Sequence, residues 1–173
     1  MQSRDFKFLL KEMRRLLRPG GVLVLYDMEM ASWMRDGTDP WKSAPALCTF
    51  TQGIVKSLTA DGIPIANLPL VGTYLRELGG FTDIDDLVMC VPIGNWDTES
   101  ELQIELGQMV RDNCANALYA TTPLLRRTGK TPEEVEKLLV DARHELYEKN
   151  LEMFERIFYV FARKEELPFE DET

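Results

Sequence analysis

The sequence lacks the residue clusters that most metal sites and nucleophilic sites need. Its 173 residues include one histidine, His144, and three cysteines that are widely spaced and form no C-x-x-C pair. A zinc site requires several Cys or His ligands, and a disulfide framework requires paired cysteines in a short secreted chain. We therefore expect no metal site, no disulfide framework, and no Cys-His or Ser-His-Asp catalytic set.

Positive charge and long apolar runs are also scarce. The chain has 20 Lys and Arg against 29 Asp and Glu, which gives a formal net charge of -9. Proteins that bind nucleic acid carry clustered Lys and Arg along the phosphate backbone. No apolar run is long enough to cross a membrane, and no apolar N-terminal segment precedes a cleavage site. We expect no nucleic-acid partner, no membrane partner, and a location in the cytoplasm or, alternatively, the nucleus.

A helix, a tight turn and a buried strand stand at the start of the chain. Apolar residues recur every three or four positions between Phe6 and Leu17, which is typical of one face of a helix, and Ser3 is its candidate N-cap. Pro19 and the two glycines after it end this helix, because proline disfavours helical geometry before it and glycine tolerates positive φ. Residues 22–25 are apolar without alternation. This run favours a strand covered on both faces, although a buried helix segment has the same pattern.

The remaining elements follow from periodicity and from start and stop signals. Helical spacing predicts three further helices, over about 70–78, 98–117 and 131–146. The first ends at a glycine stop, and capping-box patterns begin the other two at Thr98 and Thr131. The apolar stripe of the last helix is Val135, Leu138, Leu139, Ala142 and Leu146. Apolar runs predict two further strands, over 87–91 and 157–162. Residues 28–51 fit no single period, and residues 54–58 are predicted as a short helix. The last residues, 166–173, are rich in Asp and Glu and are predicted to form a loose acidic tail.

Two motifs carry a resemblance to a known family. Arg18-Pro19-Gly20-Gly21, the apolar strand and Tyr26-Asp27 resemble the second half of class I S-adenosylmethionine-dependent methyltransferases, where the fourth helix leads into strand five. Residues 130–139, 142–146 and 158–164 look like the tail of fungal small-molecule methyltransferases and their regulatory relatives. Together the two motifs cover most of the chain.

The resemblance implies a fold. We expect an α/β protein with a truncated Rossmann-like methyltransferase fold, in which about three strands follow the family order five, seven, six. Helices are expected on both faces of the sheet, with a helical insertion before the last strand. In residues, this is a single domain over 1–165 with the insertion at about 98–154, followed by the acidic tail.

The resemblance also implies a missing cofactor site. The family holds S-adenosylmethionine with a glycine-rich turn after its first strand and an acidic residue that ends its second strand. The sequence has no G-x-G-x-x-G pattern between a predicted strand and a predicted helix. By the resemblance, strands one to four and the cofactor site are absent. We therefore expect no cofactor on this chain alone, whereas the complete family uses S-adenosylmethionine.

Aromatic side chains after the first strand are the candidate binding site. In the family this segment crosses the substrate side of the sheet, so the resemblance places a small-molecule pocket among five residues, Tyr26, Asp27, Trp33, Trp41 and Trp96. The alternative is that Trp33 and Trp41 only cover the strand ends, because Trp is mostly buried whatever its role.

Three ionisable residues are candidates for catalysis. Asp27 and Glu29 could share one side of the chain and divide acid and base work, or they could simply form a polar strand end. His144 belongs to the residue type that titrates near neutral pH, which suits a general base. However, His144 lies off the apolar stripe of its helix, and an exposed helical histidine requires no function.

Three functions agree with these features. The chain could be a non-methylating binding or partner subunit of fungal small-molecule metabolism. It could instead be a cofactor-independent cyclase or isomerase that uses the remaining aromatic pocket, or a fragment of a small-molecule methyltransferase. Without strand four, the strand Val22–Leu25 would keep an unpaired outer edge. We expect a second protein chain, most simply another copy of this one, to cover that edge.

Overall fold

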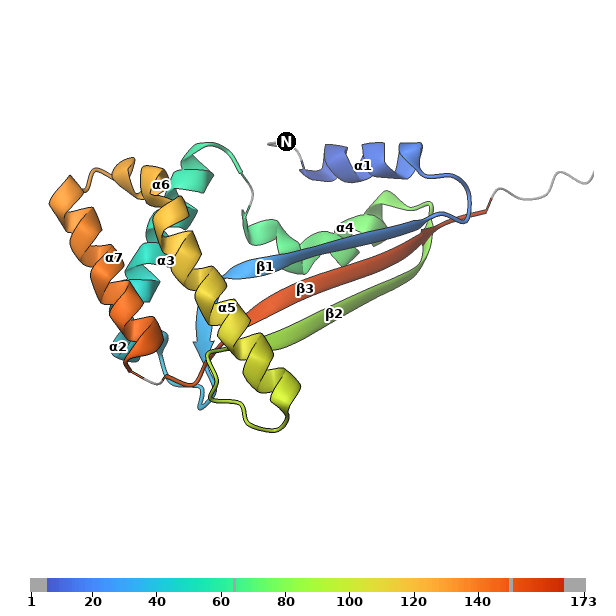
Figure 1. Cartoon of the computed structure of the whole chain (residues 1–173). Coiled ribbons are helices and arrows are strands. Elements are labelled where there is room, and N and C mark those ends of the chain that lie inside the picture. Colours follow the sequence, from blue (N-terminus) through green and yellow to red (C-terminus); the bar gives the residue numbers. More distant parts are fainter. Residues whose placement is uncertain (1–5, 64, 150, 167–173) are drawn as a thin grey trace, which may run out of the picture. The chain divides into compact units, whose positions relative to one another are not determined.

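The computed structural model describes residues 6–63, 65–149 and 151–166 (Figure 1). Its helices are α1 (Phe6–Leu16), α2 (Pro40–Ser43), α3 (Pro45–Ala60), the 3-10 helix η1 (Ile65–Leu70), α4 (Val71–Leu78), α5 (Glu101–Ala120), α6 (Thr122–Arg126) and α7 (Pro132–Tyr147). Its strands are β1 (Val22–Met34), β2 (Phe81–Ile93) and β3 (Met153–Lys164). Among the described residues, every helix is too short or too polar to span a membrane.

The three strands form one sheet in the order β1-β3-β2. The end of β3 lies beside the starts of both neighbours, because Lys164 N–H donates to Gly21 O and Glu165 N–H donates to Gly80 O. At the other end, Arg35 N–H donates to Glu152 O. The strands are therefore antiparallel neighbours, and the chain is an α/β protein. The assignment of these strands to strands five, seven and six of the family stays a prediction.

Contacts divide the chain into two compact units. Over the described residues, the sheet unit comprises 6–27, 66–89 and 158–166, and the helical unit comprises 28–65 and 90–157. The predicted insertion at 98–154 lies in the helical unit. Residues 28–65 belong to the same unit, although nothing in their periodicity groups them with the insertion. The predicted tail lies outside the described residues beyond Glu166.

In the sheet unit, α1 and α4 lie along the same face of the strands (Figure 1). The core between these two helices and the strands is formed by Leu10, Leu23, Val71, Leu75, Phe81, Val160 and Ala162. The turn into β1 uses Gly20, whose φ of 70° is the positive value expected there. Gly20 N–H donates to Lys164 O, so this turn also joins the ladder between β1 and β3.

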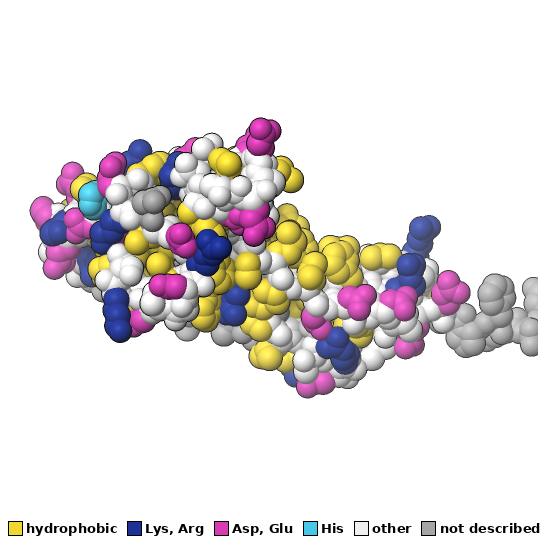
Figure 2. Space-filling model, turned by 90° about the horizontal axis from the view of Figure 1, so that it is seen from below, with side chains coloured by type: hydrophobic (Ala, Val, Ile, Leu, Met, Phe, Trp, Pro, Cys, Tyr) yellow, Lys and Arg dark blue, Asp and Glu magenta, His cyan; other side chains and the backbone are white. Residues whose placement is uncertain are grey.

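The other face of the sheet unit is open among the described residues. It exposes a row of large apolar side chains, namely Val22, Val24, Tyr26, Leu87, Met89 and Phe161. Figure 2, seen from below, shows hydrophobic side chains gathered along this unit and bordered by charged ones. Helices were expected on both faces, but here they cover one face. We call this row the open face.

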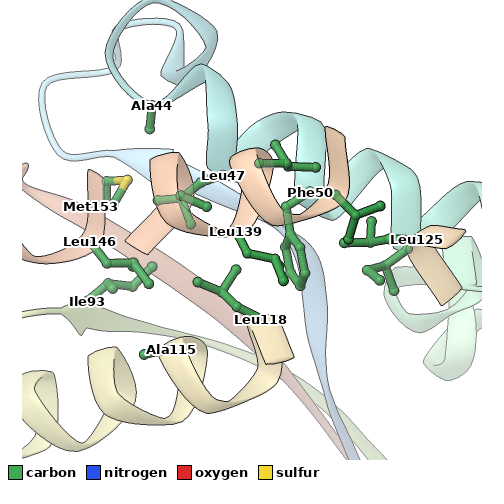
Figure 3. Close-up of a cluster of buried hydrophobic side chains, with 14 residues drawn as sticks. Ala44, Leu47, Phe50, Ile93, Ala115, Leu118, Leu125, Leu139, Leu146 and Met153 are labelled. Carbon is green, nitrogen blue, oxygen red and sulfur yellow. The ribbon is translucent and has the colours of Figure 1, made fainter. Parts of the chain in front are cut away.

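In the helical unit, α3, α5, α6 and α7 pack around a larger core (Figure 3). Phe50, Leu118 and Leu139 meet near its centre, and each comes from a different helix. Apolar residues at helical spacing explain this arrangement: Val135, Leu138, Leu139, Ala142 and Leu146 form the buried stripe of α7, as predicted.

Local start signals were predicted with mixed success. The capping box at Thr131 is confirmed, because its side chain accepts from Glu134 N–H while the Glu134 carboxylate accepts from Thr131 N–H. The capping box predicted at Thr98 is wrong. Helix α5 begins later, and Ser100 is its N-cap, accepting from Gln103 N–H. The predicted N-cap at position 3 lies outside the described residues.

Two elements are longer than their sequence patterns suggest. Strand β1 continues to Met34, well beyond the apolar run 22–25 from which it was predicted. Helix α3 starts at Pro45, the favoured residue type for a first helical position, well before the short helix predicted at 54–58.

Gly107 marks a close approach of two backbones in the helical unit. Gly94 N–H, just after β2, donates to the Gly107 carbonyl oxygen of α5 at 2.8 Å. A Cβ placed at position 107 would overlap the carbonyl oxygen of Gly94. Gly107 therefore costs α5 some helix propensity but lets the helix touch the strand end.

Candidate functional site

The helical unit contains an apolar cavity of about 230 Å³. Apolar cavities of about 150 Å³ are large enough to hold benzene. Its lining is mostly aliphatic and aromatic, with Met28, Met30, Ala31, Leu47, Phe50, Ile54, Ile93, Ala117, Leu118 and Leu146. The polar members of the lining are Glu29, Ser32, Thr51, Asn113, Cys114, Thr121 and Glu155. A small-molecule site commonly has this make-up, with apolar walls and a few polar groups.

Regular secondary structure positions the lining. Helix α3 contributes Leu47, Phe50 and Ile54, which share one helical face. Helix α5 contributes Asn113, Ala117 and other residues three or four positions apart, so one face of α5 forms the opposite wall. Residues 28–32 of β1 and Glu155 of β3 complete the wall. Because these elements are packed in a core, the shape of the cavity is fixed by rigid parts of the unit.

Glu29 belongs to this lining, but its carboxylate is already held. Arg156 donates to both carboxylate oxygens, from Nε to Oε2 at 2.6 Å and from Nη2 to Oε1 at 2.8 Å. Trp33 Nε1 donates to Oε2 at 2.9 Å, and the Arg156 guanidinium lies 4.0 Å from the Trp33 ring centre. Burial raises the pKa of Glu29, but these hydrogen bonds and the Arg156 charge outweigh it and lower the pKa below its ordinary value. Glu29 is therefore a paired carboxylate.

Glu155 is in the opposite situation. Burial raises its pKa above the ordinary value of a glutamate, and one hydrogen bond partly offsets this: the Cys114 thiol donates to Oε1 at 3.2 Å. Within the described residues, no Lys, Arg or His forms an ion pair with Glu155. Glu155 thus presents a carboxyl group without a cationic partner to an apolar cavity.

The two thiols near the cavity are poor nucleophiles. Burial raises the pKa of Cys114, and the negative charge of Glu155 raises it further. Burial likewise raises the pKa of Cys48 to about 11. Because the thiolate is the reactive form, both residues stay in the unreactive thiol form at neutral pH. No group of His, Cys, Asp and Glu in the described part of the chain is arranged to hold a metal ion.

The three predicted tryptophans lie in different environments within the helical unit. Trp33 stacks on Arg156, as described above. Trp96 donates to Met153 O at 2.7 Å and lies under the Arg35 guanidinium. Trp41 lines a second hollow of about 260 Å³, which shares Met30, Ala31, Ser32 and Thr51 with the apolar cavity. The three rings thus have different neighbours, and their joint role in binding stays a prediction.

Tyr26 and Asp27 belong to the sheet unit. Tyr26 is 70% exposed, and its ring stacks on Tyr159 with ring centres 5.6 Å apart. Tyr159 in turn stacks on Phe161. Asp27 is exposed at the end of this part of β1. The pairing of Asp27 with Glu29 as acid and base also stays a prediction. The contact of the Glu29 carboxylate with Arg156 weighs against it.

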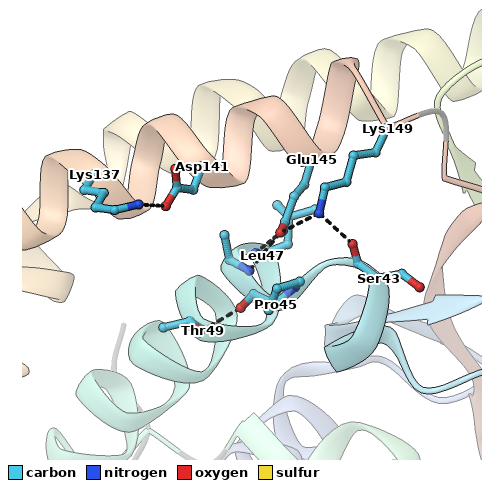
Figure 4. A network of polar contacts seen from close by, with 9 residues as sticks. Ser43, Pro45, Leu47, Thr49, Lys137, Asp141, Glu145 and Lys149 are labelled. Atoms are coloured by element: carbon cyan, nitrogen blue, oxygen red, sulfur yellow. Dashed lines mark hydrogen bonds and ion pairs between the residues drawn. The ribbon is translucent and has the colours of Figure 1, made fainter.

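His144 is exposed on α7 and lines a shallow groove at its surface. Its neighbour Glu145 has a clearer role (Figure 4). The buried Glu145 carboxylate accepts from Ala46 N–H and Leu47 N–H, and Lys149 pairs with it at 3.3 Å. Because the residue before α3 provides no side-chain cap, Glu145 satisfies the free N–H groups at the start of α3. This network is structural.

Sequence reasoning missed Cys114, Glu145 and Glu155. Glu145 sits at a buried position of the α7 stripe, between Ala142 and Leu146, and a carboxylate there signals a partner from another element. Cys114 lies beside Asn113 on the apolar face of α5. Glu155 shares the two-residue period of Met153 in β3, but the sequence does not show which residue it would face.

Comparisons with known proteins agree with the resemblance to fungal methyltransferases. Methyltransferase pytC of Aspergillus terreus is 27% identical over 163 residues, which cover 93% of this chain and 49% of that protein. Methyltransferase cpsF of Aspergillus campestris is 25% identical over 159 residues, covering 89% of this chain and 53% of that protein. The chain is methyltransferase-like. This methyltransferase-like chain spans about half the length of the curated relatives that it matches. No family model matches it.

Proposed function

We propose that this methyltransferase-like chain binds a small, mostly apolar molecule in the cavity of its helical unit and does not transfer methyl groups by itself. It would then serve fungal small-molecule metabolism as a binding or partner subunit. The observation that carries the proposal is the cavity: apolar walls, a volume of about 230 Å³ and few polar groups.

The proposal excludes S-adenosylmethionine as a ligand of this chain alone. A nucleotide-like cofactor is usually held by a glycine-rich turn that leads from a strand into a helix. The two glycine pairs of the chain, Gly20-Gly21 between α1 and β1 and Gly79-Gly80 between α4 and β2, each lead from a helix into a strand instead. Calorimetric titration with S-adenosylmethionine should give no binding heat at millimolar concentration. A micromolar dissociation constant would contradict this part of the proposal.

The cavity can be tested with a neutral probe. Phenethyl alcohol should shift the methyl resonances of Met28 and Met30, which line the cavity, in protein with carbon-13-labelled methionine methyl groups. Ala117→Leu places extra carbon atoms in the cavity and should abolish these shifts. The control is Ala120→Leu, which makes the same change at an exposed position of α5. Equal shifts in both variants, or none in the parent, would contradict the proposal.

One observation favours the alternative of a cofactor-independent enzyme. A carboxyl group with a raised pKa in an apolar cavity is a suitable proton donor, and Glu155 is such a group. Cyclisation or isomerisation in this cavity would then depend on Glu155 and on the shape that the walls impose.

The alternative of a fragment rests on the length comparison, since the chain spans about half the length of its relatives.

We also propose that a second copy of the chain covers the outer edge of β1. Among the described residues, β1 is an edge strand of the sheet. Such an edge presents unpaired N–H and C=O groups, which favour pairing with another strand. The apolar side chains Val22, Val24 and Tyr26 lie on the same strand and would add buried area to that contact.

A further inference from the structure

The lining of the apolar cavity is uneven in charge. Of its two glutamates, Glu29 is paired with Arg156, whereas within the described part of the chain the Cys114 thiol is the sole hydrogen-bond partner of Glu155. The lining contains no Lys, Arg or His. A ligand that enters this cavity therefore meets one unpaired acidic group and no basic group.

We propose that the ligand of this cavity is a small, largely apolar amine and that Glu155 is its counter-ion. This inference rests on the proposed binding function and adds the chemical class of the ligand. The Cys114 thiol donates to Oε1 and would keep doing so, which leaves Oε2 of Glu155 for the ligand ammonium group. The apolar part of the ligand would lie against Leu118, Phe50 and the other hydrophobic walls.

The protons balance for either form of the ligand. A neutral amine accepts the Glu155 proton, and the product is an ammonium–carboxylate pair inside the cavity. An amine that arrives as an ammonium ion pairs directly with the ionised carboxylate, or releases the proton of the protonated form to solvent, and forms the same pair. Either path relieves a partly buried acidic group that, among the described residues, has no cation beside it, which is an unfavourable arrangement.

Charge complementarity favours an amine over the other ligand classes. A carboxylate or phosphate ligand would face Glu155 without a compensating Lys or Arg. A neutral ligand could accept a hydrogen bond from the protonated Glu155, but it would gain no ion pair. The formal net charge of -9 also attracts cations to the protein and repels anions.

The test compares three probes of similar size on the full chain: phenethylamine, phenethyl alcohol and phenylacetate. Binding is measured near neutral pH from the Met28 and Met30 methyl resonances and by calorimetry. We expect phenethylamine to bind at least about tenfold more tightly than phenethyl alcohol, the gain typical of a hydrogen bond to a charged group. Phenylacetate should bind more weakly than either.

Glu155→Gln should remove the preference for the amine, because Gln keeps the shape of the protonated acid and cannot become a counter-ion. Glu152→Gln is the matched control, since Glu152 is an exposed residue close in sequence and pairs with Arg35 instead. The control should keep the preference. If Glu155→Gln fails to fold, the ratio of amine to alcohol affinity in the parent still decides the question.

The outcomes separate this inference from the proposed function. If phenethyl alcohol binds as tightly as phenethylamine, the amine proposal is wrong and the binding function stands. The amine proposal is also wrong if Glu155→Gln keeps the full preference. If none of the three probes binds in the cavity, both proposals are wrong.

Discussion

The sheet unit and the helical unit bury their apolar surface in different ways. In the helical unit, helices α3, α5, α6 and α7 pack around a core that includes Phe50 and Leu118, and a cavity borders this core. In the sheet unit, α1 and α4 cover one face of the strands, while the open face exposes its apolar side chains. The helical unit is thus suited to hold a small molecule, and the sheet unit is suited to contact another protein surface.

The largest expected effect tests how tightly the helical unit is packed. Gly107→Ala would normally strengthen a helix by about 1 kcal/mol. Here the new methyl group would overlap the Gly94 carbonyl oxygen, so we expect a net loss of about 3 kcal/mol in the free energy of unfolding. Urea unfolding of parent and variant measures this difference.

The control for Gly107→Ala is Gly53→Ala in α3. There the new methyl group would meet mainly the flexible end of Leu125, which can move. The change in unfolding free energy should stay within about 1 kcal/mol, because helix propensity offsets the crowding. Similar values for the two variants would show that the backbone contact between α5 and the end of β2 is not tight.

A second experiment tests the proposed contact of a second copy at the edge of β1, where Val22, Val24 and Tyr26 belong to the open face. Val24 is 48% exposed on this face, and Val24→Asp would place a charge in any interface formed there. We expect association between copies to weaken at least about tenfold, as measured by light scattering across a concentration series. Val140→Asp on α7 is the control, since Val140 is 59% exposed in the helical unit.

The control variant should associate like the parent. A parent chain that is monomeric at high micromolar concentration would contradict the second-copy proposal. So would equal weakening by both substitutions, because that result would reflect net charge and not position.

The smallest expected effect is a difference between the two glutamates of the cavity in how their contributions to stability depend on pH. The pKa of Glu29 is lowered in the folded chain, so its contribution is present above the ordinary pKa of 4.5 and is lost as the pH falls through the lowered value. Glu29→Gln should therefore cost about 1 kcal/mol at pH 7 and progressively less in acid.

Glu155 should show the opposite slope. Its pKa is raised in the folded chain, so its contribution is present below the ordinary pKa of 4.5 and is lost as the pH rises through the raised value. Relative to the parent, Glu155→Gln should become more stable as the pH rises from 4.5 toward neutral. Thermal unfolding at several pH values measures both slopes, and slopes of the same sign would contradict this assignment.

Features that depend on neighbours in the sequence could be predicted. Features that depend on contacts between distant residues could not. The Thr131 capping box and the α7 stripe depend on neighbours within a turn or two, and both were predicted correctly. The cavity depends on side chains from β1, α3, α5 and β3 that only the fold brings together. Glu155 illustrates the difficulty: its residue type and period are visible, but its partner Cys114 lies 41 residues away.

The placement of Glu145 has a consequence for how the chain acquires its structure during synthesis. Glu145 binds the start of α3 across a separation of 98 residues to Leu47 and 99 to Ala46. Helix α3 thus leaves the ribosome well before the residue that completes its first turn. Contacts between distant segments slow folding, and surface left exposed meanwhile is prone to aggregation. We therefore expect the helical unit to mature only after α7 has emerged, with α3 depending on chaperones until then.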